Sequence, residues 1–218
     1  MFQLLNYSQS YYVNNDVIPM SDSSMLLKIF DNKIGLQLMS VKSRLGREKV
    51  FFRKTAYNWL SVTHSPAPCY DSKGRLIADG ESGSFDVENA NIRDALVLLL
   101  SGKLLFARWA VLGDDFHLTL SDLLEFRFPL ERLTETELKS IASLAKKFQK
   151  EIKNHVQFKL NAGKRIGNYN TSKLWHLTNI SDEIFIKHLR PDPEKVQDAL
   201  DGFISKISIS DRSSSQDN

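Results

Sequence analysis

Apolar residues recur at helical spacing in the second half of the chain. The sequence Thr134-Glu135-Thr136-Glu137 fits a capping box, the side-chain pattern that opens many helices. Behind it the apolar positions follow one face of a helix at Leu138, Ile141, Leu144, Ala145, Phe148 and Ile152. This pattern predicts a long amphipathic helix that runs to about Phe158.

A second apolar segment, residues 95–112, is nearly long enough to cross a bilayer. Lys103 and Arg108 lie inside it, and central Lys or Arg costs about 2.5–3.5 kcal/mol on insertion scales. Ser101-Gly102 interrupts it, and Asn91 is a predicted N-cap. We therefore expect two buried helices, residues 92–100 and 103–112, and no membrane span.

Shorter helices are predicted from local start signals. Ser121-Asp122 opens a brief turn that Pro129 terminates, and Ser181-Asp182-Glu183 begins a helix toward His188. Asp192-Pro193-Glu194 supplies a cap, a first-turn proline and an acid for a helix over residues 196–207. Residues 208–218 are polar, and we expect a disordered tail.

Residues 1–88 instead show short mixed runs punctuated by Gly, Pro, Asn, Asp and Ser. Strand-like pieces occur at Ile34–Met39, Val50–Arg53, Trp59–Thr63 and Arg75–Ala78. The expected fold class is α+β, with a β-rich N-terminal half and a helical C-terminal half. The predicted division is 1–88 as a β-rich part, 89–207 as a helical scaffold with a basic loop at 161–174, and 208–218 as the tail.

Composition places the chain among ordinary globular proteins. It has 218 residues, of which 42% are hydrophobic and 25% charged. Cys69 is the single cysteine, which excludes an internal disulfide and any cysteine-built metal cluster. Met1 to Tyr12 lacks the basic flank and apolar stretch of a secretory signal, so we expect a cytoplasmic protein.

The net charge of +3 hides two strongly basic segments. Residues 42–54 hold six Lys or Arg and one acid, and residues 139–176 hold nine and one. The remainder is acidic. A positive surface on an acidic body would orient a polyanion, although two solvated faces would give the same count.

Several catalytic motifs are missing from the sequence. It contains no Gly-x-Gly pair, which excludes the dinucleotide fingerprint and the usual S-adenosylmethionine loop, and no Gly-x-Ser-x-Gly elbow. No Pro-Pro pair occurs, so the loop with which amino-methylating enzymes hold a flipped base is lacking. The cluster Asp114-Asp115-Phe116-His117 could bind a divalent metal through Asp115 and His117, as in a nuclease. Alternatively it is a turn aspartate followed by a structural histidine.

The first basic segment merges with an aromatic run, Phe51 to Trp59. On a strand, one face could pack while the other contacts DNA, with cations for phosphates and guanine edges and an amide for adenine. The candidate DNA-binding residues here are Arg44, Arg47, Lys49, Arg53, Lys54, Tyr57 and Asn58. The alternative is a core strand with a solvated edge.

The second candidate is the sequence Asn161 to Asn170. Its glycines, cations and amides would allow backbone and side chains to approach phosphates together. The candidate residues are Lys164, Arg165, Asn168, Tyr169, Asn170 and, just beyond, Lys173. The alternative is a connector in which Gly163 terminates a helix.

Three stretches resemble the C-terminal part of adenine-specific DNA methyltransferases. They are residues 95–106, residues 114–118 with 123–129, and Gly163-Lys164-Arg165-Ile166-Gly167-Asn168-Tyr169-Asn170, which is similar to a GKRxGNYN segment. The resemblance covers residues 45 to 190 or so and points to type IIG and related restriction-modification or phage-defence enzymes. The chain departs from that pattern at Ser101-Gly102, which replaces Asn-Ser, and at Asp115, which replaces Gly.

The resemblance implies an α+β fold like that of a target recognition domain, the region that recognises the double-stranded DNA target. The catalytic domain that binds S-adenosylmethionine would be a separate domain or subunit, so we expect no catalytic residue, metal or cofactor in this chain. Two other hypotheses stay open. One is a protein-interaction subunit that docks a partner through residues 95–112, and the other is the metal-dependent nuclease.

Overall fold

The computed structural model describes most of the chain between residues 24 and 208. The described ranges are 24–30, 35–43, 45–56, 59–112, 117–189 and 191–208. The predictions made for Met1 to Tyr12, for Asp114 to Phe116 and for the tail beyond Ser208 lie outside these residues.

Two consecutive buried helices form the centre of the molecule. α2 (Ala90–Ser101) and α3 (Lys103–Leu112) are bent by 55° at Gly102, so the predicted helix pair and its break are confirmed. The N-cap is Asn89, whose side chain accepts from the backbone of Ile92, and not the predicted Asn91. Within the described residues no single helix has the length and hydropathy of a membrane span; this pair meets that criterion only jointly and lies in the core.

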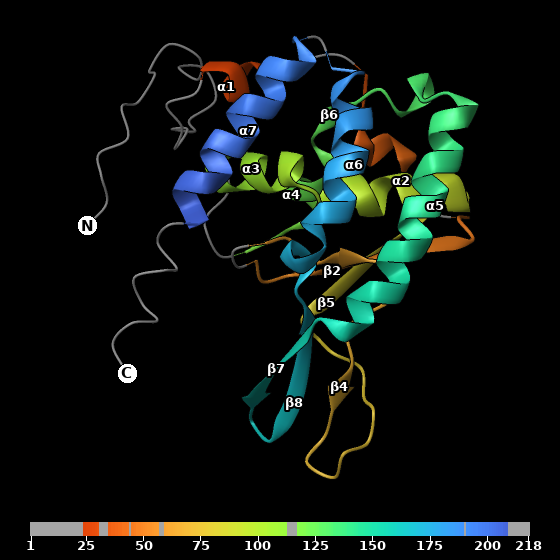
Figure 1. Ribbon diagram of the computed structural model, residues 1–218. Helices are drawn as coiled ribbons and strands as arrows, with labels where there is room; N and C mark the ends of the chain where they lie inside the picture. The colour runs from red at the N-terminus through yellow and green to blue at the C-terminus, as the bar shows by residue number, and fades with distance from the viewer. Residues whose placement is uncertain are drawn as a thin grey trace.

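The remaining helices pack around this pair (Figure 1). α5 (Glu135–Glu151) begins with the predicted capping box between Thr134 and Glu137. It packs with α6 (Trp175–Ile186) against α2, and α7 (Pro193–Ser208) lies along α1 (Ser24–Phe30) and α3. α4 (Leu120–Leu124) is the predicted short helix, capped by Thr119. Short 3-10 turns follow or join these elements at 38–41, 130–132, 152–154 and 171–174.

A small antiparallel sheet covers α2 on the side away from α5. Its strand order is β3 (Val62–Thr63), β2 (Glu48–Arg53) and β5 (Ser82–Val87). Val50 and Phe52 of β2 face the core while Lys49 points to solvent, as alternation requires. A second pair, β1 (Leu36–Gln37) with β6 (Arg127–Phe128), lies near α4.

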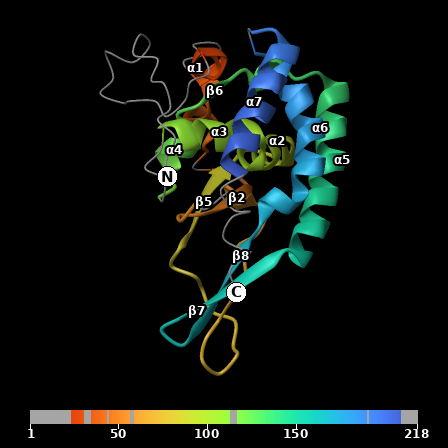
Figure 2. The same ribbon diagram turned by 60° about the vertical axis from the view of Figure 1, so that its left-hand side comes forward.

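The third sheet projects from the body in both views (Figures 1 and 2). It consists of β4 (Cys69–Tyr70), β8 (Lys164–Tyr169) and β7 (Val156–Asn161), in that order. We call residues 69–78 together with 156–169 the finger. All of β7 except its first residue is exposed, so this strand is solvated on both faces.

The finger overturns two predictions. α5 ends at Glu151, well before Phe158, and the predicted loop at 161–174 contains strand β8 over Lys164–Tyr169 and a 3-10 turn over Thr171–Leu174. Residues 156–160 alternate Val-Gln-Phe-Lys-Leu, which suits a strand, and Ala162 and Gly163 have φ of 47° and 74°. Two consecutive positive φ values form the tight turn that joins antiparallel strands.

The fold is therefore α+β, as predicted, but its halves are not segregated as expected. β4 comes from the part predicted to be β-rich, and it pairs with β8 from the part predicted to be helical. The finger thus draws on both predicted parts, and the boundary near residue 88 does not separate them.

Candidate nucleic-acid interface

The cations of the second candidate segment lie at the end of the finger. Lys164 directly follows the turn and pairs with Asn161, and Arg165 pairs with Leu160 on one side and with Tyr70 on the other. Lys164 and Arg165 are both exposed. The turn geometry therefore fixes these two cations at an outer end of the molecule.

Arg165 lies against two aromatic rings. Its guanidinium carbon is 4.6 Å from the ring centroid of Phe158 and 5.9 Å from that of Tyr70. The two rings are 6.0 Å apart. All three side chains belong to one face of the sheet, since directly opposed residues and every second residue along a strand share a face. This cation–π arrangement orders the arginine without neutralising its charge.

The other half of the same motif anchors the finger. Asn168, Tyr169 and Asn170 have only 9%, 5% and 5% of their surface exposed. A Cβ on Gly167 would stand 2.5 Å from the carbonyl oxygen of Pro68, because the backbone of Gly167 donates to that oxygen at 2.9 Å. Glycine permits this close approach of two chain segments.

The three polar residues predicted to contact DNA are thus internal. The carbonyl of Tyr169 accepts from Trp59, and Asn170 Oδ1 accepts from Ser172 at 2.5 Å. The expectation that Asn168, Tyr169 and Asn170 present their side chains to DNA is therefore corrected, because burial removes those side chains from the surface.

Two cations of the first basic segment are paired with acids. Lys49 Nζ lies 2.7 Å from Asp86 Oδ1. Arg53 is ion-paired with Asp79, and both side chains are nearly buried, at 10% and 5% exposure. The prediction that Arg53 lies on a DNA-contacting face is corrected by this pairing. The partner of Lys49, Asp86, lies on the neighbouring strand β5.

The remaining candidates of that segment are placed differently. Lys54 is exposed and donates to the carbonyl of Gly80 at 2.9 Å, and Arg47 is exposed. Arg44, Tyr57 and Asn58 lie outside the described residues. Lys173, from the second segment, is exposed three residues after Asn170.

Within the described ranges, the first basic segment approaches the second at a small cavity. The Arg53 end of β2 meets the root of the finger, where Arg53 and Asn168 line a small cavity with Ser82 and others. Arg47 and Lys49 lie toward the opposite end of β2, since Glu48 pairs with Val87 and Arg53 with Ser82. The strand direction therefore separates most of the first basic segment from the finger.

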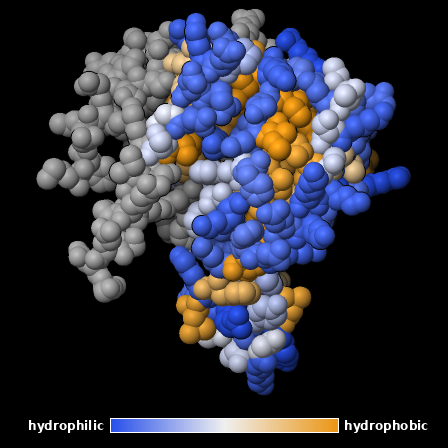
Figure 3. Space-filling model, in the orientation of Figure 1, coloured by the Kyte–Doolittle hydropathy of each residue, from blue (hydrophilic) through white to orange (hydrophobic). Residues whose placement is uncertain are grey.

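The finger also exposes residues that the sequence did not single out. It carries five Lys or Arg and one acid. Lys73 and Lys159 are exposed beside Lys164, and Arg75 is paired with Asp71 at 2.8 Å. Leu76 and Leu160 are 70% and 78% exposed. Hydrophobic and hydrophilic residues therefore lie side by side on the finger (Figure 3). The period-two pattern of residues 156–160 was the sequence signal for this strand.

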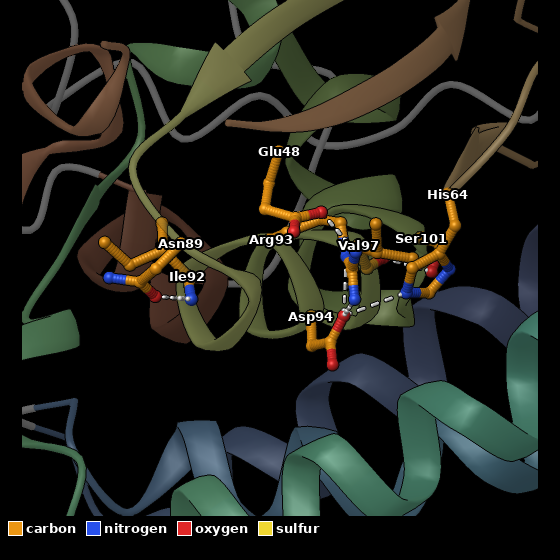
Figure 4. Close-up of polar contacts among 8 residues, drawn as sticks. All are labelled: Glu48, His64, Asn89, Ile92, Arg93, Asp94, Val97 and Ser101. Atoms are coloured by element: carbon orange, nitrogen blue, oxygen red, sulfur yellow. Dashed lines mark hydrogen bonds and ion pairs between the residues drawn. The ribbon is translucent and has the colours of Figure 1, made fainter. Parts of the chain in front are cut away.

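A second polar cluster joins α2 to the sheet (Figure 4). Arg93 is ion-paired with Glu48 and lies 2.7 Å from Asp94, which also bonds His64 Nε2 at 3.1 Å. Burial acts to raise the pKa of Asp94, but the hydrogen bonds from His64 and Arg93 outweigh it and lower the pKa below its ordinary value. These contacts join α2 to β2 and to the residue that follows β3, although His64 Nδ1 is buried without a hydrogen-bond partner.

No group of three His, Cys, Asp or Glu side chains suited to a metal occurs within the described ranges. His117 pairs with Thr55 in an isolated bridge, and its carbonyl accepts from Trp109 at 3.0 Å. Asp115, the other proposed nuclease ligand, lies outside these ranges. Residues 95–112, proposed to dock a partner, are instead mostly buried in the core, which corrects that hypothesis.

Comparisons of the chain with protein-family models, with curated proteins and with solved structures found no match. The resemblance to the C-terminal region of adenine-specific DNA methyltransferases therefore stays a prediction.

Proposed function

We propose that this chain is a double-stranded DNA recognition module and that the finger is its contact element. The observation that carries the proposal is a solvated β-ribbon that projects from the body and holds five cations against one acid. The major groove of B-DNA, about 12 Å wide, admits a two-stranded ribbon such as the one that β7 and β8 form, beside which β4 is the third strand of the finger. Ribbons of this kind are an established way to read DNA.

The charge of the finger supports a polyanionic ligand. Its one acid, Asp71, accepts from the backbones of Lys73 and Arg75 and from the Arg75 side chain. The backbone bond from Arg75 is the main reason that the pKa of this carboxyl is lowered. Asp71 therefore stabilises the loop after β4 as a local ion-pair partner, and the cations Lys73, Lys159 and Lys164 of the finger are exposed.

The wider role that we propose follows from the sequence resemblance. The module would select the target of an adenine-specific DNA methyltransferase in a restriction-modification or phage-defence system. A separate catalytic domain or subunit would then bind S-adenosylmethionine. The buried Gly167-to-Asn170 half of the motif gives the finger a firm base.

The test is the salt dependence of duplex binding by the full chain. If four to six phosphates are contacted, log affinity should fall with log salt at a slope of about −4 to −5. Lys164→Ala should reduce the slope by about one unit and weaken all sequences alike. Lys139→Ala is the matched control, because Lys139 lies toward the start of α5 and pairs with Glu135.

A flat salt response would contradict DNA binding. The exposed apolar side chains Leu76 and Leu160 favour one other candidate, a protein contact made by the same finger. Light scattering separates the two, because a protein contact would change the mass of the complex without duplex and would be lost in Leu160→Ser.

A further inference from the structure

We infer that Arg165 reads a guanine base of the DNA target and that Phe158 and Tyr70 are positioning residues that hold it for this purpose. The inference rests on the proposed DNA-binding function and names what that function recognises. The starting observation is the contact of the Arg165 guanidinium with both rings, at 4.6 and 5.9 Å.

Arg165 differs in its partners from the other arginines near the finger. Arg53 donates to the carboxylate of Asp79, and Arg75 donates to that of Asp71. In the part of the chain that the structure describes, Arg165 has no such carboxylate partner. An aromatic face attracts the cation but accepts few of its five N–H donors. Arg165 is therefore both held in place and able to bind a further acceptor.

The shape of the guanidinium indicates which acceptor would fit. A guanidinium presents paired donors in a rigid plane, and in the major groove guanine presents two acceptors, O6 and N7, at matching spacing. A phosphate would accept the same fork. An arginine that needs only to touch phosphate gains little from ordering, however, since lysines with free rotation serve equally well.

The neighbours of Arg165 on the sheet are apolar and aromatic. It pairs with Leu160 and Tyr70 across the sheet, and Tyr70 bridges to Leu76. Arg165 therefore lies in an exposed stripe of apolar and aromatic side chains, apart from the lysines of the finger. Apolar side chains suit the groove floor, where they can contact thymine methyl groups, better than they suit the phosphate backbone. The stripe and the lysines divide the finger into a base-facing surface and a backbone-facing surface.

The experiment uses the full chain and duplexes selected from a random library. We expect the selected site to contain one guanine whose replacement by adenine weakens wild-type binding by roughly 5- to 150-fold. Replacing that guanine by 7-deazaguanine, which lacks only the N7 acceptor, should weaken binding by a smaller factor. In Arg165→Lys both replacements should have little effect, although the charge is kept.

The positioning role needs its own variants. Phe158→Leu should reduce the preference for guanine while leaving the salt slope unchanged, and Phe158→Tyr should restore the preference because it keeps the ring. Lys164→Ala is the matched control at the neighbouring position, and it should weaken all duplexes equally. Unchanged melting temperatures would show that each variant is folded.

The outcomes separate the inference from the proposed function. If wild type binds duplexes but Arg165→Lys and Arg165→Ala weaken all sequences alike or not at all, Arg165 does not read a base and the inference is wrong. Insensitivity of wild type to 7-deazaguanine at every guanine of the selected site would also overturn it. A wild-type chain that binds no duplex at low salt would overturn the proposed function itself.

Discussion

The indole Nε1 of Trp59 donates a 3.0 Å hydrogen bond to the backbone carbonyl of Tyr169, 110 residues later. Nearby, the hydroxyl of Thr171 donates to the carbonyl of Leu60 at 2.7 Å. These two bonds fasten the base of the finger to the segment that leads into β3. Together with the burial of Tyr169 and Asn170, they hold the outward finger against the core.

Trp59→Phe should therefore destabilise the protein. The substitution removes the donor to the Tyr169 carbonyl, and a hydrogen bond of this kind contributes about 1 kcal/mol to the free energy of unfolding. Urea denaturation should show this loss, and hydrogen exchange should be faster in β8. Thr171→Val, which removes the second bond, should behave similarly. Unchanged exchange in β8 for both variants would show that the bonds do not hold the finger.

Two glycines should respond oppositely to alanine. A Cβ on Gly102 would stand 2.5 Å from Asp182 Oδ1, within the buried junction of α2 and α3. Gly102→Ala should cost about 2 kcal/mol or more, because a fully buried carboxylate has little room to move. Gly202 lies within α7 with no atom within 4 Å of its added Cβ.

Gly202→Ala should accordingly stabilise the protein by about 0.5–1 kcal/mol, the usual preference for Ala in a helix interior. Thermal unfolding of both variants measures the pair. A loss of stability in Gly202→Ala, or none in Gly102→Ala, would contradict the packing described for these positions.

Stability should depend on pH through Asp182. Burial, assisted by the charge of Asp201, raises the pKa of Asp182 to about 7, against the opposing effect of Lys103, whose backbone N–H donates to Oδ2 at 3.1 Å. An unfolded aspartate ionises near pH 4. Between these values the folded state keeps a proton that the unfolded state has lost, so the free energy of unfolding should fall as pH rises.

The fall should begin near pH 4, level off above pH 7 and amount to at most about 4 kcal/mol. Asp182→Asn, which stays neutral, should lack this component. The measurement is urea denaturation of both proteins from pH 4.5 to 8.5. Parallel pH profiles for the two proteins would show that Asp182 ionises normally.

Arg93 should matter more than a surface lysine in an ion pair. Arg93→Met would leave Glu48 and Asp94 close together without their cation, at side-chain exposures of only 32% and 12%. Breaking a partly buried pair from one side should cost about 2 kcal/mol, less than a fully buried pair because solvent screens part of the charge. Lys139→Ala, which breaks the exposed pair with Glu135, should change the unfolding free energy by less than about 0.5 kcal/mol.

Local signals predicted most helices correctly. The capping box at Thr134, the proline after Asp192 and the break at Ser101-Gly102 each act within a few residues, so the sequence alone shows them. The end of α5 was wrong because apolar residues continue past Ile152, and residues 156–160 fit a strand that only pairing with β8 stabilises. The start of α6 was missed because Ser181 and Asp182, which look like a start signal, are buried in its middle.

The candidate site shows the same division. The sequence identified Lys164 and Arg165 by composition, and the turn places them at the surface. It could not show that Asn168 is buried, nor that Arg53 is paired with Asp79, 26 residues away. The partners Phe158 and Tyr70 were missed because they reach Arg165 from two other strands.

By itself the sequence determined the α+β class, the central helix pair and the presence of two basic segments. These depend on periodicity, caps and counts, which are properties of neighbouring residues. The tertiary structure decided which cations keep an unbalanced charge and which polar side chains reach the surface. Burial and ion pairing depend on residues far apart in the chain. Arg53 on β2 is therefore neutralised by Asp79, whereas Arg165 on the finger is exposed beside an aromatic ring.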